Sequence, residues 1–367
     1  MMHRLSSGRP RRLTRPAGFP THDTRHSLPG PSRWVLNCGC RPEYHPHSLA
    51  IVGGSPGSLV HSALPLDPSD ASRTRRLALG FFALAAVTYL LIVLGALVRA
   101  NGAGLACPDW PLCFGKVIPR FDIKVAFEWS HRVLAGSVGL VFLGLAGLAL
   151  RPPRLRPLIW RGLLVTAVLL AVQIVLGGLT VLHLLASWTV TSHLVIGNAF
   201  ALALVYLGRR ISRLADATQT DPTPASDAQR WMTTLAGMLL GVQIVLGGLV
   251  SSNYAGLACP DWPQCMNGEF FPTWSGIQGL HLLHRSVGYA CFVGILAAAW
   301  LARSHAGSRV WLAIAAIFAT LQVVVGIANV LLRLPIEITG LHSALAAGLI
   351  CTLGVSVHES WRAAPPS

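Results

Sequence analysis

Charged residues are scarce in this chain, and acidic residues are the scarcer kind. Asp, Glu, Lys and Arg together make up 12% of the 367 residues, and 14 acidic residues stand against 29 basic ones. Hydrophobic residues make up 53% of the chain, and its mean hydropathy is +0.56. This apolar excess is more than one soluble core can bury, so an ordinary soluble domain is excluded and a membrane protein is indicated.

Long apolar stretches separate the few charges. Eight of them are long enough to cross about 30 Å of hydrocarbon at about 1.5 Å per residue. They cover approximately residues 77–98, 128–150, 158–182, 188–208, 230–251, 280–302, 308–331 and 337–358. The sequence therefore predicts an all-α membrane protein with eight transmembrane helices.

Positive charge is scarcer in the loops on one side of these spans, which hold only Arg99, Lys116, Arg120, Lys124 and Arg333. The loop between residues 251 and 279 has no Lys or Arg at all. Short cytoplasmic loops carry the excess of positive charge, so both termini are predicted to be cytoplasmic. The same placement at helix ends explains the net charge of +15, and no nucleic-acid partner is expected. The cytoplasmic set is Arg73, Arg75, Arg76, Arg151, Arg154, Arg156, Arg161, Arg209, Arg210, Arg213, Arg230, Arg303, Arg309 and Arg362.

Residues 1–72 lack both apolar periodicity and the apolar core of a signal peptide. We expect a disordered extension, from either a mis-assigned start codon or a transit peptide, and assign no role to Cys38 and Cys40. Beyond it we expect a four-helix bundle over 73–213, a cytoplasmic linker over 214–229 and a second four-helix bundle over 230–367.

A loop sequence occurs twice. The segment from Asn101 to Cys113 returns as the segment from Asn253 to Cys265, with a Cys-Pro-Asp-Trp-Pro-x-Cys core in each copy. Both copies fall on the non-cytoplasmic, oxidising side, which favours a disulfide within each loop over a zinc site or free thiols. The paired cysteines are Cys107 with Cys113 and Cys259 with Cys265, while Cys291 and Cys351 are expected to be small apolar fillers inside helices.

Four histidines recur at matched positions of the two halves. His131 and His284 each stand before an arginine near the start of a predicted helix, and His193 and His342 lie two helices further on. Ionisable residues inside membrane spans are costly and mark functional sites. A pair on two helices of one bundle can supply both axial ligands of a heme iron. Hydrogen bonding across helices is the alternative for any one histidine. Arg132 and Arg285 are predicted to pair with heme propionates.

The two halves differ three residues before the first histidine, where Glu128 stands in one half and His281 in the other. Residues three apart share a helix face, so the Glu128 carboxylate is expected beside the His131 ligand. Such a carboxylate can act as a base or stabilise a developing cation. The alternative is a helix-capping role. The asymmetry predicts that the first half performs chemistry and the second holds a redox cofactor.

Taken together, the doubled cysteine loops, Glu128-x-x-His131-Arg132, His193, His284-Arg285 and His342 resemble heme A synthase over roughly residues 77–360. This resemblance implies that heme b is held by His284 and His342 and that the substrate, heme O, lies between His131 and His193. It implies oxidation of the C8 methyl group of heme O to a formyl group with oxygen from water, with Glu128 as the catalytic carboxylate. Cys107 and Cys113 would relay electrons or shape the heme entrance.

The resemblance also implies a setting and partners. The expected place is a bacterial inner membrane, with a mitochondrial one as the alternative, and with the heme sites near the outer face. Heme O synthase and an electron acceptor are the expected partners, besides membrane lipid, and a homo-oligomer is left open. Two rival functions remain, a diheme b-type electron carrier and a non-catalytic heme-binding assembly factor.

Overall fold

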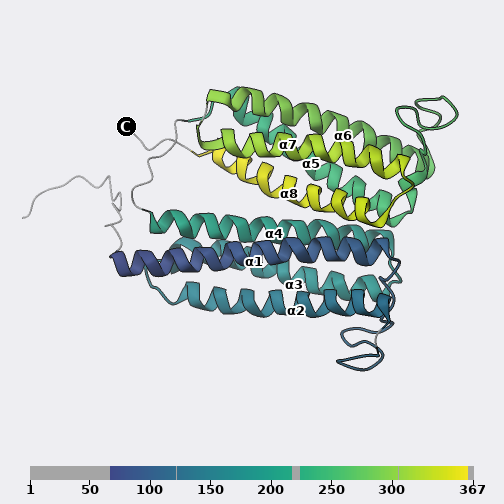
Figure 1. Ribbon diagram of the computed structural model, residues 1–367. Helices are drawn as coiled ribbons and strands as arrows, with labels where there is room; N and C mark the ends of the chain where they lie inside the picture. The colour runs from purple at the N-terminus through teal and green to yellow at the C-terminus, as the bar shows by residue number, and fades with distance from the viewer. Residues whose placement is uncertain (1–66, 121, 217–223, 305, 363–367) are drawn as a thin grey trace, which may run out of the picture. The chain divides into compact units, whose positions relative to one another are not determined.

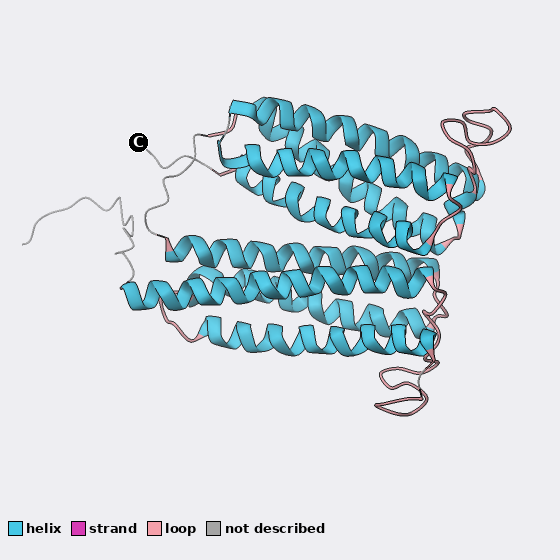
Figure 2. Ribbon diagram, in the orientation of Figure 1, coloured by secondary structure: helices cyan, strands magenta, loops and turns pink. Residues whose placement is uncertain are grey.

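The computed structural model describes residues 67–120, 122–216, 224–304 and 306–362, and these residues form helices joined by loops (Figures 1 and 2). Eight of the helices are long and apolar enough to cross a membrane. The predicted all-α architecture is confirmed, and the predicted spans match the helices to within a residue or lie inside them. The helices are α1 (Pro68–Ala100), α2 (Ile123–Leu150), α3 (Arg156–Leu182), α4 (Ser187–Ala215), α5 (Asp227–Ser252), α6 (Gly276–Leu301), α7 (Ala306–Leu331) and α8 (Ile336–Ser360).

Local signals in the sequence explain where several helices begin. The Asp67 carboxylate accepts a hydrogen bond from the N–H of Ser69 and caps α1, and Asp122 caps α2 in the same way. Since α1 begins at Pro68, the extension predicted over 1–72 ends too late, and its remainder over 1–66 lies outside the described residues. The predicted linker over 214–229 is also shorter, because α4 runs to Ala215 and α5 starts at Asp227.

Each half of the chain has its own hydrophobic core. The core of α1 to α4 includes Phe81, Phe142 and Leu204, and the core of α5 to α8 includes Ile295 and Leu353. Helices within each half pack against one another, α1 on α4 and α5 on α6 among them. The helices therefore group into two bundles, as Figure 1 shows by the separation of α1–α4 from α5–α8.

The two bundles meet through α1 and α4 on one side and α5 and α8 on the other. Two tyrosines join them, because Tyr89 donates to the carbonyl of Ala344 and Tyr206 to that of Gly354. Leu202 of α4 packs directly over Gly354. Small residues at such contacts let membrane helices approach closely. The close van der Waals packing that results holds the helices together in lipid, where the hydrophobic effect does not.

Both cysteine loops leave the bundles at the same end of the helices (Figure 2). The tight turns between α3 and α4 and between α7 and α8 lie at that end too. Each of these turns has two consecutive residues with positive φ, Leu184 with Leu185 and Arg333 with Leu334. The matching turns mean that the two halves use the same local backbone to reverse the chain.

Candidate functional site

Each of the four predicted ligand histidines lies against a glycine of the helix that precedes its own. A Cβ atom added to Gly95, Gly177, Gly247 or Gly326 would lie 3.0, 3.1, 3.2 or 3.1 Å from the ring carbon Cε1 of the facing histidine. Any larger residue at these four positions would press on an imidazole. The pairs are His131 with Gly95, His193 with Gly177, His284 with Gly247, and His342 with Gly326.

The histidines form one pair in each bundle. His131 and His193 lie close enough for charge on one to act on the other, and so do His284 and His342. The ring atom Nδ1 of all four is buried without a hydrogen-bond partner. Two imidazoles per bundle are the donor set that an iron porphyrin needs, since its own nitrogens supply the other four ligands.

This arrangement fits heme better than a single metal ion. The described residues contain no group of three or more His, Cys, Asp or Glu side chains that could hold a metal ion. The glycines leave room for each ring, and two imidazoles in a bundle can ligate an iron whose other ligands come from a porphyrin. The residues present therefore fit a bis-histidine heme in each bundle, held by His131 with His193 and by His284 with His342.

Three glutamines contact these histidines, a feature that the sequence prediction missed. The side-chain nitrogens of Gln173, Gln243 and Gln322 lie 3.3, 3.4 and 3.2 Å from Nε2 of His193, His284 and His342 respectively. Each glutamine stands four residues before the histidine-facing glycine of its helix. The repeated Gln-Ile-Val-Leu-Gly segments of α3 and α5 could have predicted this contact. Residues four apart share a helix face, so each glutamine faces the same way as the glycine that lies against the histidine.

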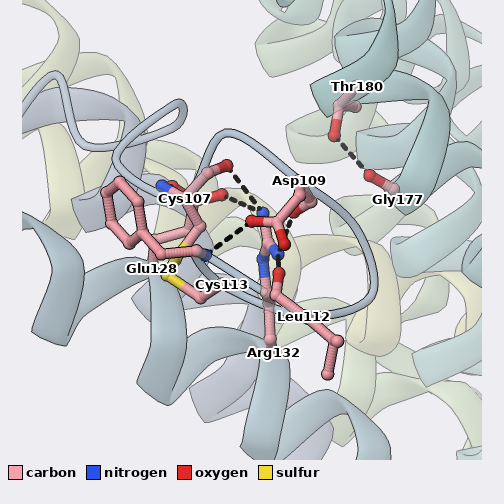
Figure 3. Close-up of polar contacts among 9 residues, drawn as sticks. Cys107, Asp109, Leu112, Cys113, Glu128, Arg132, Gly177 and Thr180 are labelled. Atoms are coloured by element: carbon pink, nitrogen blue, oxygen red, sulfur yellow. Dashed lines mark hydrogen bonds and ion pairs between the residues drawn. A yellow bond between two sulfur atoms is a disulfide. The ribbon is translucent and has the colours of Figure 1, made fainter. Parts of the chain in front are cut away.

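Arg132 fastens the first cysteine loop to α2 (Figure 3). Its guanidinium donates to the carbonyls of Asp109 at 2.6 Å, Leu112 at 2.5 Å and Cys107 at 3.1 Å. It also pairs with Glu128 at 2.6 Å. The other Glu128 oxygen accepts a hydrogen bond of 2.8 Å from the N–H of Cys107. We call Glu128 and Arg132 with the loop groups they bind the first clasp.

The second cysteine loop is held by a matching second clasp that contains no carboxylate side chain. Arg285 donates to the carbonyls of Cys259, Asp261 and Gln264. Its Nε bonds Nε2 of His281 at 3.2 Å, and Nδ1 of His281 lies 2.9 Å from the Ala255 carbonyl oxygen. His281 thus takes the position of Glu128 in the repeat. Its Nε2 accepts a hydrogen bond from Arg285, and its Nδ1 donates one to the Ala255 carbonyl.

Both clasps engage the arginines for which a propionate partner was predicted. The donors of Arg132 and Arg285 point into the loops, and the propionate role stays a prediction. Glu128 is buried, with 5% of its side chain exposed, beside the half-buried guanidinium of Arg132.

Asp109 shapes the tip of the first loop. Its two carboxylate oxygens accept hydrogen bonds from the N–H groups of Phe114 at 2.7 Å and Gly115 at 2.8 Å. Both of those residues have positive φ, the left-handed region that favours glycine. The Gly115 N–H group, with a smaller contribution from that of Phe114, lowers the pKa of Asp109 below its ordinary value.

The predicted disulfides are confirmed. Cys107 is bonded to Cys113, and Cys259 to Cys265. Cys291 and Cys351 carry free thiols inside helices, and Cys291 is buried as an apolar filler would be. The electron-relay role of the first pair stays a prediction. Trp110, between the two cysteines of the first loop, packs on Gly178 of α3. The loop therefore reaches from α2 to the helix that carries Gln173.

The fold and the site define a class of protein, a multi-pass α-helical membrane protein in which each of two bundles has a pair of histidines with buried Nδ1 atoms. The chain belongs to the COX15-CtaA family, the cytochrome oxidase assembly proteins, whose family model matches residues 78–124 and 120–353.

Individual relatives agree with this family. The chain is 31% identical over 321 residues to a heme A synthase of Shewanella oneidensis, covering 75% of this chain and 93% of that protein. It is 31% identical over 279 residues to a heme A synthase of Halalkalibacterium halodurans, covering 72% and 90%. A heme A synthase of Caulobacter vibrioides is 29% identical over 353 residues, covering 81% and 98%. The resemblance drawn from the motifs is therefore confirmed at the level of the family.

Proposed function

We propose that this protein is a heme A synthase that oxidises heme O for the assembly of cytochrome oxidase. The observation that carries the proposal is the match to heme A synthases over nearly their whole length. All four histidines and Glu128 lie inside the matched family segment of residues 120–353. The paired histidines support the proposal independently, because they fit two hemes.

The two bundles have different tasks in this proposal. His284 and His342 hold a resident heme b, which supplies one-electron redox chemistry when bound. His131 and His193 hold the substrate, heme O. Oxidation of its C8 methyl group to a formyl group consumes one water and releases four protons and four electrons. The electrons pass to an acceptor outside the chain.

We propose Glu128 as the carboxylate of this reaction. The second clasp supports the assignment, because His281 and Arg285 hold an equivalent loop without a carboxylate. Holding the loop therefore does not by itself require an acidic residue at position 128. Glu128 lies one turn before His131 on α2, and its oxygens keep lone pairs beyond the two bonds they accept. It can therefore orient a water or stabilise positive charge that develops at the methyl carbon.

Pigment analysis tests the function. The full chain is expressed with a supply of heme O and purified, and its hemes are extracted and separated by chromatography. Heme A is expected with the unaltered chain, together with one retained heme b. Two retained b hemes and no heme A would instead identify a diheme electron carrier, and protein that binds heme without converting it would indicate an assembly factor.

The variant Glu128→Ala tests the catalytic carboxylate. We expect heme A to fall by at least about a hundredfold, the usual contribution of a positioned acid or base, while the heme b at His284 and His342 is retained. Glu128→His provides the matched control, because it copies the second clasp. It should keep the loop ordered and still make no heme A. Normal heme A formation by either variant would contradict the assignment.

The proposed setting follows from charge and disulfides. Loops poor in Lys and Arg and rich in disulfides belong on the oxidising side, which puts the heme sites near the periplasmic face of a bacterial inner membrane. Heme O synthase is the proposed donor of the substrate. After mild reduction, a membrane-impermeant maleimide should label Cys259 and Cys265 on cells with a permeabilised outer membrane. Labelling only after the inner membrane is opened would reverse the orientation.

A further inference from the structure

One of the four histidines lacks the amide partner that the other three have. In α3, α5 and α7 the residue four before the histidine-facing glycine is Gln173, Gln243 or Gln322. In α1 the same position is Leu91, within the otherwise equivalent segment Leu91-Ile92-Val93-Leu94-Gly95. His131 therefore has no glutamine at its ring among the described residues.

The difference is confined to this side chain. Gly95 and Gly177 approach their histidines at almost equal distances. The two ligands of the N-terminal bundle are thus seated alike, except that one faces an amide and the other an apolar side chain.

The amide competes for the atom that binds iron. A glutamine side-chain nitrogen carries only donor hydrogens, so the Nε2 atom of the facing histidine must accept the bond with its lone pair. An imidazole that ligates iron through Nε2 uses the same lone pair. Coordination of iron by His193 therefore breaks the bond to Gln173, whereas coordination by His131 breaks no side-chain amide bond.

We propose that Gln173 and Leu91 make the two ligands of the N-terminal heme unequal. We call His131 the anchor, because it binds the incoming heme first and dissociates from it last. His193 is the ligand that binds second and dissociates first. This proposal rests on the proposed function, in which that site exchanges substrate for product. Gln173 is a positioning residue, because it acts through His193.

The placement of the anchor suits the reaction. His131 shares a helical turn of α2 with Glu128 and Arg132, which are fixed to the first loop by the clasp. A heme that stays on His131 keeps its position relative to the Glu128 carboxylate while its other ligand is made or broken. In the C-terminal bundle both histidines face glutamines, so neither is distinguished in this way.

Heme binding and spectra test the proposal separately from turnover. Purified full chain with its resident heme is titrated with ferric heme O, and the six-coordinate low-spin fraction at the N-terminal site is followed by electron paramagnetic resonance. Gln173→Leu should raise the affinity about fivefold, the equivalent of one hydrogen bond of ~1 kcal/mol, and should increase the low-spin fraction. Leu91→Gln should change both in the opposite direction.

Two further comparisons keep the test decisive. Leu90→Gln inserts the same amide one residue away on the outward side of α1, where Leu90 is 61% exposed, and should leave both readings unchanged. His193→Ala should retain heme O as a five-coordinate complex, whereas His131→Ala should lose most of it.

Equal heme retention by His131→Ala and His193→Ala, or weaker binding by Gln173→Leu, would overturn the proposal. A chain that showed this ligand asymmetry and yet made no heme A would leave the asymmetry standing and remove the proposed function.

Discussion

At the scale of single residues, glycine decides where the imidazoles lie. Glycine inside a helix is less favourable than alanine by about 1 kcal/mol. Gly95, Gly177, Gly247 and Gly326 nevertheless stand in the middle of apolar helices, each opposite a histidine ring. The space that each missing Cβ provides is therefore filled by the ring of a proposed ligand histidine.

A substitution on α5 tests this role of glycine. Gly247→Ala adds a Cβ that would lie 3.2 Å from Cε1 of His284, so the ring must shift. Overpacking of this kind costs about 1–3 kcal/mol. We expect the heme that we propose at His284 and His342 to lose affinity by about 5- to 150-fold, and its low-spin spectrum to give way to a high-spin one.

The control lies on the same helix. A Cβ at Gly241 meets nothing within 4 Å, so Gly241→Ala should keep the heme content and spectrum of the unaltered chain. If the two variants retain heme equally, the glycine at 247 has no role in seating His284.

At the scale of elements, the first cysteine loop is held in three ways. The disulfide closes it, the clasp of Arg132 and Glu128 binds its backbone to α2, and Asp109 closes its tip. The second loop has its own disulfide and clasp. In the described structure, however, the Asp261 carboxylate does not accept hydrogen bonds from the backbone that follows Cys265. The tips of the two loops should therefore respond differently to acid.

The predicted response follows from the sign of the Asp109 shift. Its pKa is lowered by the N–H groups of Gly115 and Phe114. The stabilisation is therefore complete above the ordinary aspartate pKa of about 3.9 and is lost as the pH falls through the lower, folded value. A phosphine reductant should cleave the Cys107–Cys113 bond faster as the pH drops below about 4.

Two controls accompany this measurement, with the thiols alkylated and identified by mass spectrometry. Asp109→Asn should make cleavage of the first disulfide fast at every pH and remove the acid dependence. The Cys259–Cys265 bond in the same molecules should not accelerate. An equal acceleration of both bonds in acid would show that Asp109 does not govern the loop.

At the scale of the whole molecule, a buried ionic cluster joins the two bundles at the end opposite the cysteine loops. The Glu359 carboxylate of α8 is 2% exposed and pairs with Arg209 at 2.7 Å and with Arg213, both on α4. Arg362 reaches the other carboxylate oxygen at 3.3 Å. Glu359 of the second bundle therefore pairs with two arginines of the first.

Removing that charge should weaken the contact between the bundles. Glu359→Gln removes the charge with which Arg209 and Arg213 pair, and breaking a buried pair costs about 3 kcal/mol. We expect the thermal unfolding midpoint of the detergent-solubilised protein to fall by several degrees.

Asp216→Asn is the control, because the Arg75–Asp216 pair is exposed and such pairs contribute at most about 1 kcal/mol. Identical midpoints for the two variants would mean that Glu359 does not hold the bundles together.

Much of this molecule follows from local sequence signals. Apolar length predicted the eight spans, and capping residues such as Asp122 mark where helices begin. The doubled loop predicted both disulfides, because each cysteine pair lies on the oxidising side and brackets two prolines that can fold the loop back on itself. Matched positions in the repeats singled out the histidines and Glu128.

Contacts between distant segments needed the three-dimensional structure. The guanidinium of Arg132 contacts loop carbonyls 20 to 25 residues earlier in the chain, and no local pattern predicts such contacts. The role of the glutamines also escaped prediction, since their partners lie on a different helix. No periodicity within one helix reveals which residue of a neighbouring helix it meets.

Hydrophobic length and short-range spacing are properties of the chain, so they were enough to predict the membrane setting, the eight spans, the disulfide pairs and the candidate ligands. Helix packing was needed to show that a glycine faces each candidate histidine, that Glu128 and His281 hold matching loops, and that Leu91 leaves His131 without an amide. These contacts depend on the register at which two helices pack. That register is set by the side chains of both helices together.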